Sequence, residues 1–339
     1  MNGKTHIVVD AMGGDNAPGA IVRGAAAAAV KREDIEITFT GNPAAITQEL
    51  DKIGSWPKDR IHIRETTEVI EMAEHPVDAV RTKKDSSMVA GLMMVRHQEA
   101  DAFISAGNSG AVLVGGQILV GKIRGVERPP FAPLIPTRKG VSLLVDCGAN
   151  VDARPSHLVQ FARIGSEYME KVVGIKNPRV GIVNIGAEEE KGNALVKETF
   201  PLLKECEDIN FIGSVEARDI PQGVCDVIVG EAFVGNVILK LYEGTAKALL
   251  SEVKKGLLSS VRSKIGAVLI KPALKETLKT FDAKSYGGAP LLGLKGLVVK
   301  VHGSAEEIEV EHAVYQCVQF KEQKINEHIA DMFSRRREE

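Results

Sequence analysis

The sequence predicts a three-layer α/β fold, in which helices cover both faces of one mostly parallel sheet. Short β-branched runs alternate with helical stretches along most of the 339 residues, which is the pattern of βαβ units. Several of these runs, such as residues 7–9 and 143–145, are continuously apolar, as strands buried on both faces are. Aromatic residues make up only 4% of the chain, so we expect a core of Val, Ile, Leu and Ala.

The alternation assigns the elements in chain order. Strands are expected where short runs are rich in β-branched or aliphatic residues, at residues 5–10, 35–40, 61–65, 102–105, 143–146, 180–185, 210–213 and 227–230. Helices are expected in the intervals, at residues 18–31, 86–98, 109–121, 156–173, 194–205 and 305–332. A last apolar strand follows a glycine-rich turn, at residues 298–301. We expect these elements to form one large α/β domain over residues 1–339.

Residues 235–284 interrupt the alternation, because they carry no strand signal and several helical segments. We therefore expect a protruding helical hairpin inserted in the domain. The stretch 256–281 of this hairpin contains one acidic residue, Glu276, and five basic ones, Arg262, Lys264, Lys271, Lys275 and Lys279. Apolar residues recur there at helical spacing, at Leu257, Leu258, Val261, Ile265, Val268 and Leu269. Such a basic amphipathic helix can bind anionic lipid or an acidic partner, but periodicity alone favours an ordinary hairpin with its apolar stripe in the core.

The composition limits the classes of partner and compartment. A net charge of −2 argues against a general polyanion binder such as a nucleic-acid-binding protein. The four cysteines lie far apart without metal-ligand spacing, which argues against a zinc site or disulfide framework and fits a reducing cytoplasm. The first strand begins almost at once, leaving no room for a signal peptide, and no apolar run reaches the roughly 20 residues that span a bilayer. We expect a cytoplasmic protein without a metal or other cofactor.

Two glycine-rich loops suggest an anionic ligand. The strand at residues 5–10 ends in Asp10 and runs into Gly13, Gly14 and Asp15, and a second loop contains Tyr286, Gly287 and Gly288. Glycine pairs are placed where the backbone approaches another group closely or takes a positive φ. Such loops can present backbone N–H groups to a phosphate-sized anion or a phosphorylated compound.

Three mid-chain turns place small or amide-bearing residues after a strand, where open α/β sheets bind their ligands. The first contains Asn108, Ser109 and Gly110, the second runs from Asp146 to Asn150, and the third follows Asn184. Asn108 and Ser109 could cradle an anion, or they could simply cap a helix. Cys147 fits a small buried apolar residue better than a nucleophile. His302, beside the glycine loop, is as a lone residue more often structural than catalytic.

Several common enzyme motifs are missing from the sequence. A Walker A loop is not present, which argues against nucleotide hydrolysis. The first strand is not followed by GxGxxG, and neither GxSxG nor HExxH occurs. A composite site built from the glycine loops and strand-end turns is therefore the best candidate.

Taken together and in this order, the motifs resemble those of the PlsX-type phosphate acyltransferases over essentially the whole chain. They are DAMGGD at 10–15, SAGNSG at 105–110, DCGAN at 146–150, NIGAE at 184–188, KG at 191–192, GNVILK at 235–240, EG at 243–244 and YGGAP at 286–290. Each motif alone is weak, but the combination is highly specific. Ser109 stands where the family pattern leads us to expect Thr, and the hydroxyl is retained.

The resemblance implies a fold, an activity and partners. The fold would be Rossmann-like and similar to those of the isopropylmalate dehydrogenases and phosphotransacetylases. The activity would be formation of an acyl phosphate from acyl carrier protein, loaded with a long-chain acyl group, and inorganic phosphate, the entry step to bacterial phosphatidic acid. The family forms homodimers that associate peripherally with the membrane surface, and a membrane glycerol-3-phosphate acyltransferase is a further candidate partner.

The resemblance also suggests roles for residues. The expected catalytic set is Lys191, as a cation for phosphate or the developing oxyanion, with Asn184, Lys240 and His302. The expected phosphate- and substrate-binding set is Asp10, Gly13, Gly14, Asp15, Asn108, Ser109, Gly110, Asp146, Asn150, Asn236, Tyr286, Gly287 and Gly288. For the hairpin, the resemblance reverses the preference for a buried stripe, so that its apolar residues would rest on an anionic bilayer and its cations would face lipid phosphates or the acidic carrier protein.

The chemistry is compatible with a site that has no nucleophile–base pair. Phosphate already carries anionic oxygens, and a thiolate with a reference thiol pKa of roughly 8.5 can leave without obligatory protonation. The site must position phosphate, stabilise the oxyanion and exclude water. Three alternatives stay open at this point: a phosphotransacetylase-like enzyme using acyl-CoA, an NAD-dependent hydroxyacid dehydrogenase, and a non-catalytic lipid-surface adaptor. The dehydrogenase would need an acidic metal cluster and an arginine-rich strand that the sequence does not show, and the adaptor leaves the glycine loops unexplained.

Overall fold

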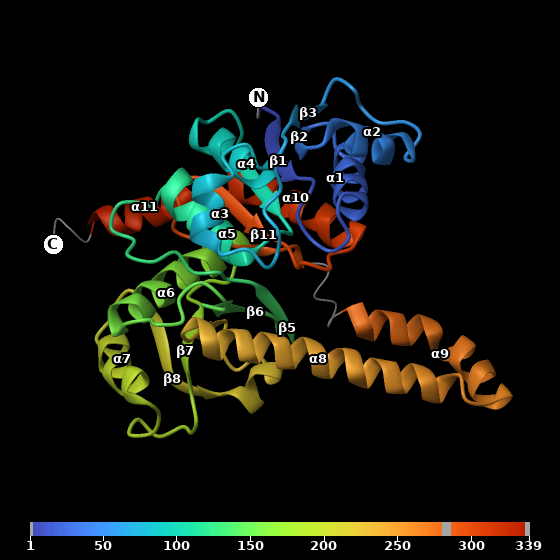
Figure 1. The fold of residues 1–339 in the computed structure, drawn as a ribbon. Helices are drawn as coiled ribbons and strands as arrows, with labels where there is room; N and C mark the ends of the chain where they lie inside the picture. The colour runs from blue at the N-terminus through green and yellow to red at the C-terminus, as the bar shows by residue number, and fades with distance from the viewer. Residues whose placement is uncertain (1–2, 280–285, 336–339) are drawn as a thin grey trace. The chain divides into compact units, whose positions relative to one another are not determined.

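The computed structural model describes residues 3–279 and 286–335 (Figure 1). The chain divides into two compact units. Unit 1 contains Met1–Pro133, Arg163–Asn177 and Lys284–Glu339, and unit 2 contains Leu134–Ala162 and Pro178–Ala283. Each unit is built on its own sheet.

The sheet of unit 1 has six strands in the order β10-β11-β4-β1-β2-β3. All neighbours pair in parallel except β10 with β11. The strands are β1 (Thr5–Asp10), β2 (Ile35–Gly41), β3 (Ile61–Glu65), β4 (Ala102–Ser105), β10 (Ala289–Pro290) and β11 (Leu297–Lys300). The central strands β1 and β4 are buried along almost their whole length, which explains their continuously apolar sequences.

The helices of unit 1 bury small and aliphatic faces against this sheet. Helix α1 packs on β2 and α10, and α4 packs on β1, β2 and β4. The elements are α1 (Gly19–Lys31), α2 (Pro43–Asp51), α3 (Pro76–Thr82), α4 (Ser87–Arg96), α5 (Ser109–Gly115), η1 (Gly116–Val120), η2 (Met169–Val173), α10 (Glu307–Glu322) and α11 (Ile325–Arg335). The run of alanines in α1 allows a close approach to its neighbours, and all but one of its alanines are buried.

The sheet of unit 2 has five strands in the order β5-β6-β9-β7-β8, and all neighbours are parallel except β5 with β6. The strands are β5 (Leu134–Thr137), β6 (Gly140–Val145), β7 (Arg179–Asn184), β8 (Asn210–Glu216) and β9 (Val227–Val229). The helices are α7 (Ala194–Lys204), η3 (Ala217–Gln222), α8 (Ala232–Leu257) and α9 (Val261–Lys279), while α6 (Pro155–Tyr168) belongs in part to each unit. Both units thus confirm the expected α/β class with mostly parallel sheets.

Some sequence expectations about individual elements were wrong. The helix expected at 305–332 is two helices, α10 and α11, because Lys324 takes φ +50° between them. Strand β5 and the short helices α2 and α3 were not expected. The inserted hairpin begins at Ala232, and the expected residues 280–284 at its end lie outside the described residues. The single large domain over 1–339 stays a prediction.

Most residues of the α8–α9 hairpin are exposed in the single chain. Every residue from 243 to 256 is exposed. The apolar stripe that periodicity placed in the core is also largely exposed, so that interpretation is wrong for the isolated chain. The exposed fractions are 51% for Leu258, 73% for Val261, 59% for Ile265, 71% for Val268 and 76% for Leu269.

Candidate active site

In unit 1, the loops that follow parallel strands meet at the carboxyl edge of the sheet. The loop after β1 contacts the loop after β11, because the N–H of Asp15 donates to the carbonyl of Gly303 at 2.7 Å. The Asn16 side chain donates to the carbonyls of Ser304 and Ala305, at 3.1 Å each. The loop after β4 joins them at Gly14. The expected proximity of the first glycine loop to the Asn108 turn is therefore present in the structure.

Gly14 shows why this meeting point requires glycine. Its φ is +100°, and a Cβ built there would lie 2.7 Å from the Cβ of Ala106 and 2.9 Å from the carbonyl oxygen of Gly303. A side chain would separate the three loops or strain the backbone. Gly14 therefore lies where the three loops meet.

Asp10, the last residue of β1, is fully buried and forms hydrogen bonds with the loops of this edge. Its carboxylate accepts hydrogen bonds from the Ser105 hydroxyl at 2.7 Å and the Met12 N–H at 3.2 Å, and Gly13 also donates to it. Burial raises the pKa of Asp10, and hydrogen bonds from Ser87 and Ser105 oppose that rise. Asp10 therefore positions the loops, and its buried carboxylate is in no position to contact a ligand.

Asn108 acts as the helix cap that the sequence left as an alternative. Its Oδ1 accepts from the N–H of Ala111 at 3.1 Å. Its Nδ2 donates to three carbonyls of the loop between β3 and α3, those of Glu71, Met72 and Glu74, at 3.3, 3.1 and 3.0 Å. Asn108 is a link between two loops, so the expectation that its side chain binds an anion directly is wrong for this conformation.

The neighbouring backbone is better suited to an anion. Among the described residues, the N–H groups of Gly14, Ser109 and Gly110 have no hydrogen-bond acceptor. Ser109 is exposed. Unsatisfied N–H groups in a loop cluster are the donors that a phosphate or an oxyanion would use.

The Tyr286-Gly287-Gly288 loop also reaches this edge, because it leads into β10, which pairs with β11. Its role differs from expectation. The Gly288 N–H donates to Oε1 of Gln316 at 2.9 Å, and the Gln316 amide donates to the Gly288 carbonyl at 3.1 Å. A Cβ at Gly288 would lie 2.6 Å from the carbonyl oxygen of Lys300. The expectation of a bare amide at Gly288 is wrong: this glycine permits close packing against β11, and Gln316 holds it there.

His302 follows β11 and is exposed. Its Nδ1 accepts a hydrogen bond from the Ser304 N–H at 3.2 Å, and the Ser304 hydroxyl lies 2.8 Å from the same atom. Because Nδ1 is an acceptor here, the neutral ring carries its proton on Nε2. Nε2 is therefore the donor nitrogen of the neutral His302 ring.

One buried cation at this edge was not predicted from the sequence. Lys300, the last residue of β11, is buried, and its ammonium donates to the carbonyls of Ala106, at 3.2 Å, and Val301. The sequence signal was a lysine within an otherwise apolar strand directly before His302. It gave no indication that the charge would be buried at the loop cluster.

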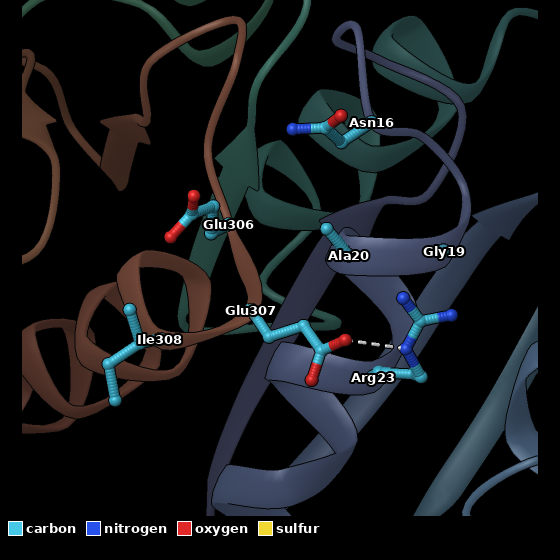
Figure 2. A pocket seen from close by; sticks show the side chains of 7 residues that line it. All are labelled: Asn16, Gly19, Ala20, Arg23, Glu306, Glu307 and Ile308. Carbon is cyan, nitrogen blue, oxygen red and sulfur yellow. Dashed lines mark hydrogen bonds and ion pairs between the residues drawn. The ribbon is translucent and has the colours of Figure 1, made fainter.

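A pocket of about 600 Å³ lies beside the same loops, and Figure 2 shows its lining. It is formed by Asn16, Gly19, Ala20, Arg23, Glu306, Glu307 and Ile308. The Arg23 guanidinium donates to Glu307 at 2.7 Å and also pairs with Glu49. Because two carboxylates already neutralise the charge of Arg23, this pocket attracts an anion less strongly than the N–H groups of Gly14, Ser109 and Gly110 do.

The carboxyl edge of the unit 2 sheet carries the second group of motifs. Asp146, directly after β6, is buried and accepts from Asn150 through both the backbone N–H, at 2.7 Å, and the side-chain amide, at 2.8 Å. It also accepts from the N–H groups of Gly148 and Ala149, at 3.2 Å each. Asp146 and Asn150 therefore shape the DCGAN loop, much as Asp10 shapes its own loop.

The start of α8 lies against this loop, because the Ala232 N–H donates to the Asn150 carbonyl at 3.1 Å. Asn236 and Lys240 follow on the helix and are exposed. Burial raises the pKa of the Cys147 thiol well above its usual value, while the charge of Lys240 opposes the rise. Cys147 is therefore a neutral thiol, as its sequence setting suggested, and Lys240 lies near the loop.

Asn184 and Lys191 occupy the loop after β7. The Asn184 amide donates to the Lys191 carbonyl at 3.1 Å and the Ser214 hydroxyl at 3.0 Å, and its Oδ1 accepts from the Ile185 N–H. Both amide hydrogens are used, so the expectation that Asn184 donates to substrate is wrong for this conformation. The Lys191 side chain is 50% exposed and pairs with Glu188 at 2.9 Å, a hydrogen bond that raises the pKa of Lys191.

Comparison with known proteins decides the family. A model of the family described as "Fatty acid synthesis protein" matches residues 5–328. A phosphate acyltransferase of Alkaliphilus oremlandii is 52% identical over 325 residues, which is 96% of each chain, and one of Clostridium novyi is 46% identical over 95% of this chain and 98% of its own. The chain belongs to the PlsX-type phosphate acyltransferase family.

Solved structures support the fold of this family member. A phosphotransacetylase of Streptococcus pyogenes matches 94% of each chain with a TM-score of 0.61 at 17% sequence identity. At that identity the likeness concerns the fold alone, and it confirms the expected Rossmann-like class. Within the described residues, none of the helices has the length and apolar character needed to cross a membrane.

Proposed function

We propose that this family member transfers a long-chain acyl group from acyl carrier protein to inorganic phosphate, the first step of phosphatidic acid synthesis. The observation that carries the proposal is full-length family membership, with relatives named phosphate acyltransferase. The convergence of strand-end loops in unit 1 supports it, because it offers N–H donors that have no acceptor among the residues that the structure describes.

Phosphate is proposed to bind at the carboxyl edge of unit 1. The proposed donors are the N–H groups of Gly14, Ser109 and Gly110 with the Ser109 hydroxyl, and His302 lies in the adjoining loop after β11. Asp10 and Asn108 hold these loops in place through the buried hydrogen bonds described above. Asp15, Tyr286 and the two glycines that follow it complete the loop cluster.

The reaction requires positioning more than acid–base chemistry. A phosphate oxygen attacks the thioester carbonyl carbon, a C–O bond forms, and the C–S bond breaks as the thiolate leaves. The thiolate takes its proton from solvent after departure, because its pKa of roughly 8.5 makes it an acceptable leaving group. N–H donors aimed at the developing oxyanion lower the barrier, and exclusion of water protects the mixed anhydride.

The cations of unit 2 are proposed to serve the oxyanion and the acyl donor. Lys191 is the first choice for the oxyanion and Lys240 the second. Asn236, exposed on α8, is proposed to contact the donor. Asp146 and Asn184 are proposed to act by holding the loops that carry these side chains, since their polar atoms bind protein groups.

The α8–α9 hairpin is proposed to contact an anionic membrane surface and the acidic carrier protein. Its exposed apolar residues, such as Val261 and Leu269, would rest on lipid, while Arg262, Lys264, Lys271 and Lys275 would face phosphate groups or carboxylates. Each cation near such a surface contributes about 1 kcal/mol, which gives reversible attachment. A peripheral cytoplasmic homodimer, delivering its product to a membrane acyltransferase that uses glycerol 3-phosphate, is part of this proposal.

The test compares the kcat/KM of the purified protein with different acyl donors. We expect acyl phosphate from acyl carrier protein and phosphate, at a kcat/KM at least tenfold above that with acyl-CoA, a difference of about 1.4 kcal/mol. Preference for acyl-CoA would favour a phosphotransacetylase-like enzyme instead. Thermal stabilisation by NADH but not by phosphate would favour a dehydrogenase, and absence of turnover with every donor would contradict the proposed activity.

A further inference from the structure

The loop of residues 69–74, between β3 and α3, contacts the Asn108 turn and has little contact with the core. Among these residues, all of which the structure describes, only Ile70 is buried, and the three residues after it are exposed. A segment that buries so little apolar surface depends on hydrogen bonds for its conformation. The hydrogen-bond partners of this loop therefore decide where its backbone lies.

The first partner of the loop is the side-chain amide of Asn108. Its Nδ2 donates to the carbonyls of Glu71, Met72 and Glu74, at 3.3, 3.1 and 3.0 Å. Only 7% of Asn108 is exposed, so water cannot readily replace these acceptors. The same side chain fixes its own turn, because its Oδ1 accepts from the Ala111 N–H at 3.1 Å.

The second partner of the loop is Lys83, which directly follows α3. Its ammonium donates to the Val69 carbonyl at 2.6 Å and to Oε1 of Glu74 at 2.5 Å. The same carboxylate oxygen accepts from the Glu71 N–H at 2.7 Å. The hydrogen bond from Lys83 lowers the pKa of Glu74, so this carboxylate is ionised at neutral pH. One ion pair thus holds the beginning, the middle and the end of the loop.

The two sets of contacts meet in the same stretch of backbone. The N–H of Glu71 binds the ion pair, while the carbonyls of Glu71 and Glu74 accept from Asn108. Loss of the ion pair would let these carbonyls move, and the buried Asn108 amide would lose acceptors that it requires. Movement of Asn108 would displace the N–H groups of Ser109 and Gly110, and an oxyanion is stabilised best by donors that are fixed in advance.

We propose that Lys83 is a positioning residue for the phosphate site. Through Glu74 and the loop 69–74, it holds the Asn108 turn in the geometry that binds phosphate. The inference rests on the proposed function, and it gives Lys83 no contact with phosphate or with the acyl donor. Loss of Lys83 should therefore weaken phosphate binding and leave the KM for the acyl donor nearly unchanged.

The experiment measures binding of inorganic phosphate to the full-length protein by isothermal titration calorimetry. Steady-state kinetics gives the KM values for phosphate and for the acyl donor. Lys83→Met removes both hydrogen bonds, and Lys83→Arg keeps a cation that can donate to the same two acceptors. Glu74→Gln removes the charge of the partner and keeps an oxygen that can accept from the Glu71 N–H.

Lys321→Met is the matched control, because its contacts are of the same kind. Lys321 donates to a backbone carbonyl, that of Lys4 at 3.0 Å, and to Oδ2 of Asp101 at 2.6 Å, which also accepts from the His6 N–H at 2.8 Å. The exposed fractions of the two lysine side chains are similar, 29% for Lys83 and 35% for Lys321. Lys4 and Asp101 precede β1 and β4, so this pair lies at the edge of the sheet opposite the loop cluster.

We expect Lys83→Met to raise the Kd and the KM for phosphate at least about fivefold and to change the KM for the acyl donor less than about twofold. Lys83→Arg should recover most of the phosphate affinity. Lys321→Met should bind phosphate within about twofold of the wild type even if its melting temperature falls as much. If Lys83→Met does not fold, Glu74→Gln decides the question with the same expected direction.

Unchanged phosphate affinity in the folded Lys83→Met variant would overturn the assignment. An equal loss of phosphate affinity in Lys321→Met would also overturn it, because the effect would then follow from stability alone. An equal rise in both KM values would overturn it too, since the damage would not be confined to the phosphate site.

Turnover separates this assignment from the proposed function. A wild type that binds phosphate in a manner dependent on Lys83, but makes no acyl phosphate from acyl carrier protein, would contradict the function and leave the Lys83 assignment standing. A wild type with full turnover whose Lys83→Met variant keeps the phosphate KM would contradict the Lys83 assignment alone. A wild type that neither binds phosphate nor turns over would contradict both.

Discussion

The Gln316 side-chain amide forms a pair of hydrogen bonds with the backbone of Gly288. We expect these bonds to contribute both to the free energy of unfolding and to the affinity for phosphate. Replacing Gln316 with Leu removes the two hydrogen bonds to Gly288, of 2.9 and 3.1 Å, and the hydrogen bond with the buried Tyr168 hydroxyl. The buried N–H and carbonyl of Gly288 then lose these partners. Each unsatisfied group costs about 1–3 kcal/mol, so we expect a loss of about 3 kcal/mol after partial relaxation. For a chain of this size that loss lowers the melting temperature by roughly 5 °C.

The matched control lies one helical turn away. Gln319 donates one hydrogen bond, to the Val172 carbonyl at 2.8 Å, and its side chain is exposed. Gln319→Leu should cost about 1 kcal/mol or less. Differential scanning fluorimetry gives the two melting temperatures, and steady-state kinetics gives the phosphate KM, which should rise at least about threefold for Gln316→Leu only. Equal effects of the two substitutions on both quantities would refute the reasoning.

Three further predictions concern the other features. Lys191→Ala should lower kcat/KM by roughly a hundredfold or more, a loss of 2–4 kcal/mol, and a loss below about fivefold in the kinetic assay would make Lys191 structural. Changing Leu258 and Val261, which are 51% and 73% exposed, to Glu should abolish co-sedimentation with anionic liposomes without a large change in melting temperature, whereas a large drop would show that they are core residues. Burial raises the pKa of Glu311, but the Lys31 hydrogen bond at 2.6 Å helps bring it below the ordinary value of 4.5. In thermal melts, the stability that Glu311→Gln loses should therefore be present at pH 7 and disappear as the pH falls below 4.5 through the lowered pKa of Glu311. A difference between the two proteins that stays constant across that range would contradict the shift.

Much of the fold was accessible from the sequence because buried parallel strands are continuously apolar. The bounds of β1, β3 and β4 agree with the expected runs at 5–10, 61–65 and 102–105. Strand β5 was missed because Pro136 weakens its strand signal, and its pairing with β6 depends on a turn at Gly140 that periodicity does not reveal. The exposure of the hairpin was also beyond periodicity, since an amphipathic helix has the same pattern whether its apolar side meets a core or a partner.

The position of the candidate site was predictable from the sequence, but the hydrogen-bond partners of its residues were not. Strand ends and glycine pairs located the loops, because carboxyl ends of parallel strands share one edge. The partners of Asn108 and Gly288 come from distant segments, the loop at 71–74 and Gln316 on α10. Such pairings are set by tertiary packing, so the sequence suggested free donors where the structure has satisfied ones. Lys300 was missed for the same reason, since its burial depends on the loops around it.

A crystal structure of the protein with inorganic phosphate would test the central claim most directly. The account predicts a phosphate at the carboxyl edge of unit 1, within hydrogen-bond distance of the N–H groups of Gly14, Ser109 and Gly110. Phosphate bound instead in the loop of Lys191, or in the pocket of Arg23, with the Gly14 loop unoccupied, would contradict it.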